Sequence, residues 1–216
     1  MNDIERIILT AEKEVGYKEE PMGKHLTKYG IEYGWNGVAW CVIFIWWLFK
    51  KCYLSSLFFD GGKTASCGAV YRWAVKKGIV VKTPKRGDLV IFTFRKDKNG
   101  NPETSHIGLL VDCNSKYVTT IDGNTCVNGS PDNGGHVMKQ TRSRKYVYAF
   151  IRPLYNESEI IEFEYTVVHG DSLYKIAEKF YGENKGHLWK KIYEYNGLTS
   201  TIIHSGQKLK LPSLVD

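Results

Sequence analysis

The chain has 216 residues, of which 43% are hydrophobic and 25% charged, and its formal net charge at pH 7 is +7. The length allows one domain of ordinary size and a small second one, and the composition excludes an intrinsically disordered chain. Residues 1–155 carry 23 basic and 14 acidic side chains, whereas residues 156–216 carry 7 and 9. The basic first part favours an anionic polymer as partner. Because no nucleic-acid-recognition signature accompanies the charge, we expect no nucleic acid.

The first 17 residues have apolar side chains at the spacing of an amphipathic helix, namely Ile4, Ile7, Ile8, Ala11 and Val15. This segment has neither the basic start nor the apolar run of a signal peptide. The most apolar stretch, residues 38–49, is shorter than the roughly 20 residues that cross a bilayer and predicts a buried helix. We expect a protein made in the cytoplasm without a signal peptide and without membrane insertion, which needs another agency to reach a target outside the cell.

The rest of the first domain runs from helices to strands. A helix over residues 68–77 should stop at Gly78, since glycine favours the left-handed conformation of a helix end. After turn residues at 84–88 come short runs of β-branched and aromatic residues, at 89–94, 106–112, 117–124, 136–141 and 146–154. This order predicts an α+β fold in which N-terminal helices pack on an antiparallel sheet.

The C-terminal quarter has a pattern of its own. Residues 155–164 are acidic and predict a linker, and residues 165–212 predict strand, turn, helix, helix and strand. One stripe of the first of these helices is apolar, formed by Leu173, Ile176, Ala177 and Phe180. We therefore expect domains at 1–154 and 165–212, the second a small βααβ unit.

Metal and disulfide signatures are absent from the sequence. The five cysteines include no CxxC pair and no zinc-type spacing with histidine. Asp97, Asn99 and Asn101 alternate as in a calcium loop, but basic neighbours and the lack of a glutamate at the twelfth position favour a hairpin turn. We expect no metal and no cofactor.

Cys41 stands at the start of the apolar run. A thiol in the first turn of a helix lies at the positive end of the helix dipole and beside unpaired amide hydrogens, which lower its pKa and would also stabilise an oxyanion. This arrangement suits a nucleophile, although for Cys41 taken alone the structural interpretation is preferred. The alternative is a small apolar core residue, which is the common role of a free cysteine.

His106 and the segment Asp122–Asn124 supply partners for such a thiol. On a strand, His106 and Gly108 share the less apolar face, and Gly108 leaves room for another element to approach. Asp122 and Asn124 are two residues apart, so both should point the same way, and one of them would accept the Nδ1–H bond of His106. The alternatives are a structural histidine and an ordinary Asp-Gly-Asn turn.

These residues resemble a known family. Trp40–Cys41 within residues 37–47, the strand entry at 86–92, the segment 105–110 and Ile121–Asn124 are similar to the CHAP domain, the papain-like cysteine, histidine-dependent amidohydrolase/peptidase family. The resemblance implies Cys41 as nucleophile, His106 as base, and Asp122 and Asn124 as the residues that orient it. The family usually has glutamate where this chain has Asp122. The tryptophans of this domain are expected mostly in the core, with Trp35 and Trp40 as candidate walls of a substrate groove.

Residues 165–212 resemble a LysM module, which binds the N-acetylglucosamine-containing backbone of peptidoglycan or chitin. The resemblance implies a groove formed by two loops, with the candidate binding residues Gly170, Asp171, Ser172, Leu173, Asn196, Gly197, Leu198 and Ile203. The alternative for Asp171 is that it caps the helix that follows.

Together the resemblances imply a peptidoglycan hydrolase similar to a phage endolysin, which cleaves amide bonds by acyl transfer to cysteine. The bond would lie in a stem or cross-bridge peptide, or between muramic acid and L-alanine. The implied partner is the peptidoglycan of a Gram-positive wall, and we expect a monomer. The alternatives are a non-catalytic peptidoglycan-binding or virion structural protein, and a thiol protease that acts on proteins.

Overall fold

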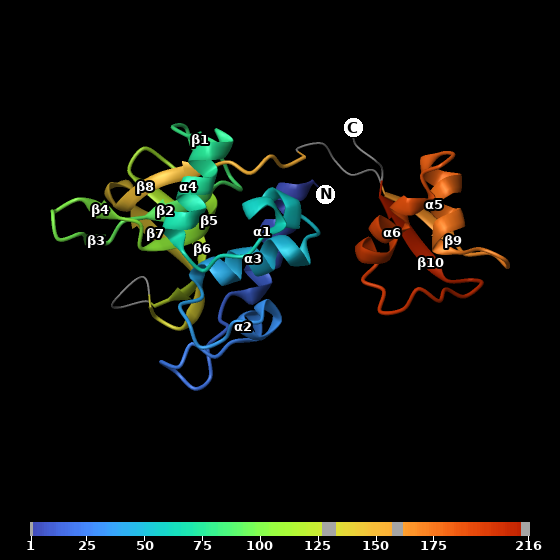
Figure 1. Cartoon of the computed structure of the whole chain (residues 1–216), viewed down its shortest axis with the longest axis horizontal. Coiled ribbons are helices and arrows are strands. Elements are labelled where there is room, and N and C mark those ends of the chain that lie inside the picture. The colour runs from blue at the N-terminus through green and yellow to red at the C-terminus, as the bar shows by residue number, and fades with distance from the viewer. Residues whose placement is uncertain (1, 127–132, 157–161, 213–216) are drawn as a thin grey trace. The chain divides into compact units, whose positions relative to one another are not determined.

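The chain divides into two compact units, Asp3–Tyr155 and a unit that begins at Asn156 (Figure 1). The computed structural model describes residues 2–126, 133–156 and 162–212. Most of the linker expected at 155–164, namely residues 157–161, lies outside the described residues. The exact domain bounds therefore stay a prediction.

Among the described residues, four helices form one part of the first unit. They are α1 (Asp3–Glu14), α2 (Lys28–Tyr33), α3 (Cys41–Lys51) and α4 (Cys67–Lys77), with short turns η1 (Ser55–Leu57), η2 (Phe59–Gly61) and η3 (Arg144–Tyr146). Gly78 ends α4 with a φ of 69°, in the left-handed conformation that the sequence predicted. The sequence did not predict α2, which Thr27 caps by accepting a hydrogen bond from the Gly30 amide.

An antiparallel sheet forms the rest of this unit, in the order β1-β8-β2-β5-β6-β7. Its strands are β1 (Val80–Val81), β2 (Leu89–Phe92), β5 (His106–Cys113), β6 (Tyr117–Thr125), β7 (His136–Ser143) and β8 (Val147–Ile151). A separate hairpin joins β3 (Arg95–Lys96) and β4 (Pro102–Glu103), and the Asp97 carboxylate accepts the amides of Asn99 and Asn101 in its turn. The predicted α+β fold and hairpin turn are confirmed.

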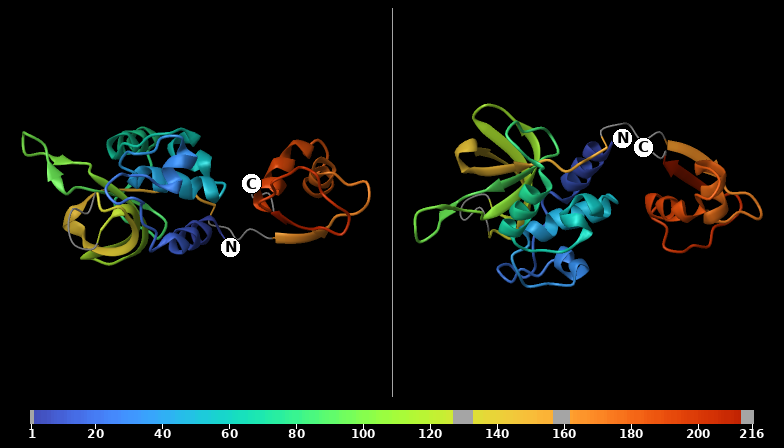
Figure 2. Two further views of the ribbon diagram at one scale, coloured as in Figure 1. Left: turned by 90° about the horizontal axis from the view of Figure 1, so that it is seen from below. Right: turned by 45° about the horizontal axis from the view of Figure 1, so that its top comes forward.

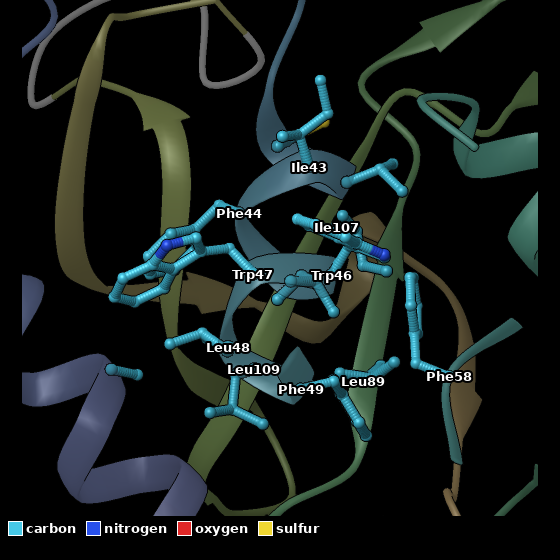
Figure 3. Close-up of a cluster of buried hydrophobic side chains, with 14 of the residues drawn as sticks. Ile43, Phe44, Trp46, Trp47, Leu48, Phe49, Phe58, Leu89, Ile107 and Leu109 are labelled. Atoms are coloured by element: carbon cyan, nitrogen blue, oxygen red, sulfur yellow. The ribbon is translucent and has the colours of Figure 1, made fainter. Parts of the chain in front are cut away.

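Helix α3 is buried from Cys41 to Phe49 and lies against β5 and β6. Figure 3 shows its side chains beside Leu89 of β2 and Ile107 and Leu109 of β5. Each large apolar side chain withdrawn from water contributes about 1.5–3 kcal/mol before the entropy cost of folding. This packing fixes the first turn of α3 against the strands that carry the other candidate site residues.

The opposite face of the sheet is also covered, because the strands curl (Figure 2). Val90, Phe92, Leu110, Val118 and Phe150 form a second, smaller cluster there. The alternation predicted for β5 is confirmed: Ile107, Leu109 and Val111 belong to the main core, while Leu110 lies on the other face. His106 therefore enters a closed interior, where it is fully buried.

The second unit is the predicted βααβ arrangement. Its elements are β9 (Glu162–Thr166), α5 (Leu173–Tyr181), η4 (Gly186–Leu188), α6 (Trp189–Tyr195) and β10 (Lys208–Pro212), with β9 and β10 antiparallel. Leu173, Ile176 and Ala177 lie in its core, with Phe180 packed against it. The first strand begins at Glu162, three residues before the expected start.

Within the part of the chain that the structure describes, no helix combines the length and apolar character needed to span a membrane.

Candidate active site

Cys41 is the first residue of α3, and 4% of its surface is exposed. Its Sγ lies 3.9 Å from the Sγ of Cys67. The hydrogen bond with Cys67 lowers the pKa of Cys41, burial opposes this, and the charge of the nearby His106 together with the Val42 amide lowers it further. The net effect is a pKa well below the ordinary value, so the thiol ionises readily.

His106, the first residue of β5, interacts with Asp122 of β6, and both side chains are fully buried. The distance between Nε2 of His106 and Oδ2 of Asp122 is 3.2 Å. This corrects the expectation that Nδ1 faces the carboxylate. Nδ1 has no hydrogen-bond partner among the described residues, which leaves it as the nitrogen available to the Cys41 thiol.

The pKa shifts of His106 and Asp122 agree with this hydrogen bond. Burial alone would lower the pKa of His106, but the Asp122 hydrogen bond and the Cys41 thiolate raise it to about 9. Burial alone would raise the pKa of Asp122, but the charge of Arg142 and the hydrogen bond with His106 hold it below the ordinary value. These shifts favour a thiolate–imidazolium pair beside an ionised carboxylate.

Gly108 and Gly123 make room for this arrangement. A Cβ on Gly108 would lie 2.0 Å from Oδ1 of Asp122, and one on Gly123 would lie 2.6 Å from Cβ of Phe44 in α3. Real Cβ atoms do not approach so closely, so a side chain at either position would displace the carboxylate or the helix. The close approach predicted beside Gly108 is found, and the approaching group is the carboxylate of Asp122.

Asn124 does not follow the direction of Asp122, because the β6–β7 register shifts between Asp122 and Thr125 and Asn124 has a φ of 59°. Its side chain donates to Oδ1 of Asn133 at 3.2 Å and accepts from the Gly135 amide at 3.4 Å. Of the two candidates, Asp122 is hydrogen-bonded to His106, and Asn124 ties its own strand to the segment before β7.

Trp40 is fully buried, so its expected place on a groove wall is corrected. Its indole stacks on Tyr29 with ring centroids 5.5 Å apart, and Nε1 donates to the buried Glu19 at 2.8 Å. The indole supports the start of α3 from inside. Trp35, in contrast, is 54% exposed.

An open pocket of about 540 Å³ reaches the thiol. Residues that line it come from several elements and include His25, Cys41, Cys67, Arg72, Glu103 and Asn133. The nucleophile candidate therefore has access to a molecule from solvent, although most of its own surface is covered.

Two residues of this site have no counterpart among the sequence-derived candidates. Arg142 of β7 donates from Nη1 to Oδ2 of Asp122, and Cys67, the first residue of α4, contacts Cys41. Ser66 caps α4, and a serine is a typical helix cap, so the sequence could have placed Cys67 in the first turn of a helix, as Cys41 is. No local sequence pattern predicts that Arg142 is buried beside Asp122, because this position depends on the pairing of β7 with β6.

We expect replacement of Cys67 by alanine to weaken the acidity of Cys41, because the hydrogen bond that most lowers the Cys41 pKa is lost. Alkylation of Cys41 by iodoacetamide at pH 6, followed by mass spectrometry of its peptide, should be several-fold slower. Cys113→Ala changes a half-buried thiol at the end of β5 and is the control. An unchanged alkylation rate in Cys67→Ala would contradict the prediction.

The candidate glycan-binding residues of the second unit divide into loop and core positions. Gly170 and Gly197 lie in turns with positive φ, while Leu173 is 3% exposed and Leu198 and Ile203 pack against the same core. Their shared cluster brings the two loops together. The Leu173 side chain is too buried to contact a ligand, so its place among the binding residues stays a prediction that concerns its backbone groups.

Polar candidates in these loops already have partners inside the unit. Ser172, not Asp171, caps α5, and the Asp171 carboxylate accepts from the Tyr165 hydroxyl and the Val168 amide. The Asn196 side chain bridges α6 to β10 by accepting the Lys210 amide and donating to the Lys210 carbonyl. These side chains shape the loops, so backbone groups remain the candidates for contact with a sugar.

Across residues 2–126, 133–156 and 162–212, no group of three or more His, Cys, Asp or Glu side chains is arranged to hold a metal ion.

Comparison with known proteins agrees with both units. The family model of the CHAP domain matches residues 33–124, and that of the LysM domain matches residues 165–212. The fold and site thus define a two-domain chain with a buried cysteine–histidine–aspartate site in its first domain. The chain contains a CHAP domain followed by a LysM domain.

Curated relatives match only short stretches. The N-acetylmuramoyl-L-alanine amidase sle1 of Staphylococcus epidermidis is 50% identical over 48 residues, which are 22% of this chain and 13% of that protein. An uncharacterized protein of Deinococcus radiodurans is 49% identical over 49 residues, 22% of this chain and 19% of that protein. The chain therefore spans less than a fifth of the length of these relatives.

Among solved structures, the wild-type endolysin LysIME-EF1 is 16% identical, with a TM-score of 0.45 over 73% of this chain and 67% of that chain.

Proposed function

We propose that the chain is a peptidoglycan hydrolase that cleaves amide bonds through Cys41. The observation that carries the proposal is a thiol at the start of α3 whose pKa is lowered by the charge of a histidine that is itself hydrogen-bonded to a buried carboxylate. The CHAP and LysM matches support peptidoglycan as the polymer, and the staphylococcal relative, an N-acetylmuramoyl-L-alanine amidase, agrees with it.

The proposed reaction is acyl transfer. The Cys41 thiolate attacks the amide carbonyl, and free amides in the first turn of α3 stabilise the oxyanion. The His106 imidazolium then donates its proton to the leaving amine, which leaves a thioester. Neutral His106 next takes a proton from water as the water attacks the thioester, and the thiolate is regenerated. Asp122 holds the imidazole ring and stabilises its positive charge.

The LysM domain is proposed to hold the enzyme on N-acetylglucosamine-containing glycan. Backbone groups of the loops around Gly170 and Gly197 suit the acetamido and hydroxyl groups of a sugar. A tethered binding site raises the concentration of scissile bonds near the catalytic domain. We further propose a monomer that acts as a phage endolysin does, on a Gram-positive wall after its release from the cytoplasm.

The test is digestion of purified Gram-positive peptidoglycan by the intact chain and by Cys41→Ala, with new amino groups and new reducing ends measured together. We expect amino groups without reducing ends from the intact chain, and binding without cleavage from Cys41→Ala. N-terminal analysis of the fragments separates endopeptidase from amidase cleavage. If both proteins bind and neither cleaves, the chain is a non-catalytic wall-binding protein and the proposal is wrong.

A further inference from the structure

Arg142 carries a guanidinium that is almost entirely buried, with 8% of its side chain exposed. Nη1 donates to Oδ2 of Asp122 and, at 3.2 Å, to Oγ1 of Thr120. Nη2 donates to Oγ1 of Thr125 at 3.0 Å. These acceptors all stand on β6, so the guanidinium is fixed along one strand.

Aromatic rings complete this environment. The Arg142 Cζ lies 5.0 Å from the ring centre of Phe92 and 5.8 Å from that of Phe94, distances typical of cation–π contacts. A buried arginine with so many fixed contacts has few alternative conformations. Its charge is therefore held at a constant place relative to the Asp122 carboxylate.

The oxygen that Arg142 binds is the one that faces His106. Oδ2 of Asp122 accepts from Arg142 and lies 3.2 Å from Nε2 of His106. The other oxygen, Oδ1, lies beside Gly108 and has no hydrogen-bond partner among the described residues. The carboxylate thus bridges two cations through one oxygen, and its orientation depends on both.

The energetic reason is the cost of a buried charge. A carboxylate that is fully removed from water becomes protonated unless positive charges and hydrogen bonds compensate. His106 compensates only while it is protonated, and it loses its proton when the leaving amine is formed. Arg142 remains charged at every step, since guanidinium does not lose its proton in proteins.

We propose that Arg142 is a positioning residue of the hydrolysis described above: it directs Oδ2 of Asp122 toward His106 and keeps that carboxylate charged throughout the reaction. The functional chain is then Cys41, His106, Asp122 and Arg142. The inference rests on the proposed function for its role in turnover, but the state of the Cys41 thiol reports on it without any substrate.

The test compares the full chain with Arg142→Met and Arg142→Lys. Methionine keeps the length of the side chain without its charge, and lysine keeps the charge without the forked guanidinium that reaches Thr120, Asp122 and Thr125. Arg144→Met is the matched control, because it removes the same charge two residues later, where the guanidinium donates to the Asn114 carbonyl and stacks on Phe150. Peptidoglycan hydrolysis and Cys41 alkylation by iodoacetamide are both followed from pH 5 to 9.

For Arg142→Met we expect kcat/KM at pH 7 to fall about 10–100-fold, the usual effect of losing a group that orients a reactive side chain. The loss should grow toward pH 5, where Asp122 without Arg142 takes up a proton, and the alkylation profile should move to higher pH in parallel. Arg142→Lys should fall between Arg142→Met and the intact chain in both measurements, and Arg144→Met should match the intact chain.

A folded Arg142→Met protein with unchanged alkylation and hydrolysis profiles would overturn the proposal, as would a variant that differs only in thermal stability. If Arg142→Met does not fold, Arg142→Lys becomes the test. Hydrolysis and alkylation rates equal to those of the intact chain would then show that the forked guanidinium is not needed, and the proposal would be overturned. Failure of the proposed function would look different. The intact chain would then not cleave peptidoglycan, while replacement of Arg142 would still change the rate of Cys41 alkylation.

Discussion

Replacement of His106 by alanine is expected to lower kcat/KM on peptidoglycan by about 10⁴–10⁶-fold, the range found when the base of a catalytic triad is removed. The imidazole contributes twice, since it stabilises the Cys41 thiolate and protonates the leaving amine. His136→Ala is the control, because His136 lies in the same domain and its Nδ1 is within 2.7 Å of the Gly134 carbonyl. Near-normal turnover by His106→Ala would remove His106 from the mechanism.

The pH profile of the intact chain adds a second signature. The reactive thiolate–imidazolium pair exists between the lowered pKa of Cys41 and the raised pKa of His106, about 9. Hydrolysis should therefore decline as pH rises through about 9, when the proton for the leaving amine is lost. Residual activity of His106→Ala should lack this decline.

Stability should respond to pH less than activity does. The raised pKa of His106 contributes stability that is complete below its ordinary value of 6.5 and is lost as pH rises to about 9. The lowered pKa of Cys41 contributes stability that is complete above its ordinary value of 9.0 and is lost as pH falls through the folded value. Between pH 6.5 and 9 the two effects oppose each other.

Replacement of Asp122 by asparagine should lower kcat/KM by about 10²–10⁴-fold, because the amide keeps the shape but not the charge that orients and stabilises the imidazolium. The substitution also leaves Arg142 without its carboxylate in the interior. Loss of one member of a buried ion pair costs about 3–5 kcal/mol of unfolding free energy. Initial hydrolysis rates and urea unfolding measure the two effects separately.

Two further variants make the Asp122 result specific. Asp112→Asn changes an exposed carboxylate of β5, whose Oδ1 accepts the Cys113 amide, and should leave both measurements unchanged. Asn124→Ala tests the other candidate for the orienting residue. The assignment to Asp122 fails if Asn124→Ala is inactive while Asp122→Asn retains the rate of the intact chain.

Local patterns predicted most of the first domain. The apolar run that starts at Cys41, the end of α4 at Gly78 and the alternation of β5 each depend on neighbouring residues only, and each is found in the structure. The short helix α2 was missed because six residues with mixed polarity give no clear period. The start of β9 was missed because the acidic residues at its beginning are more typical of a linker than of a strand.

The site was predictable as far as its residue types and their order along the chain. The rule that side chains two apart on a strand point the same way failed at Asn124, where a register shift and a positive φ turn the side chain elsewhere. Trp40 was a candidate groove wall, but it is fully buried. Its burial depends on Tyr29 and Glu19, which are distant in sequence.

The sequence by itself determined that a helix begins at Cys41, that His106 and Asp122 lie on strands of one antiparallel sheet, and that a separate βααβ domain follows. These features arise from local propensity and hydrophobic period. Only the tertiary structure decided which nitrogen of His106 faces Asp122, that Arg142 shares the same carboxylate oxygen, and that Cys67 meets Cys41. Contacts of this kind depend on strand register and sheet curvature, which bring together residues that are 16 to 26 positions apart in the chain.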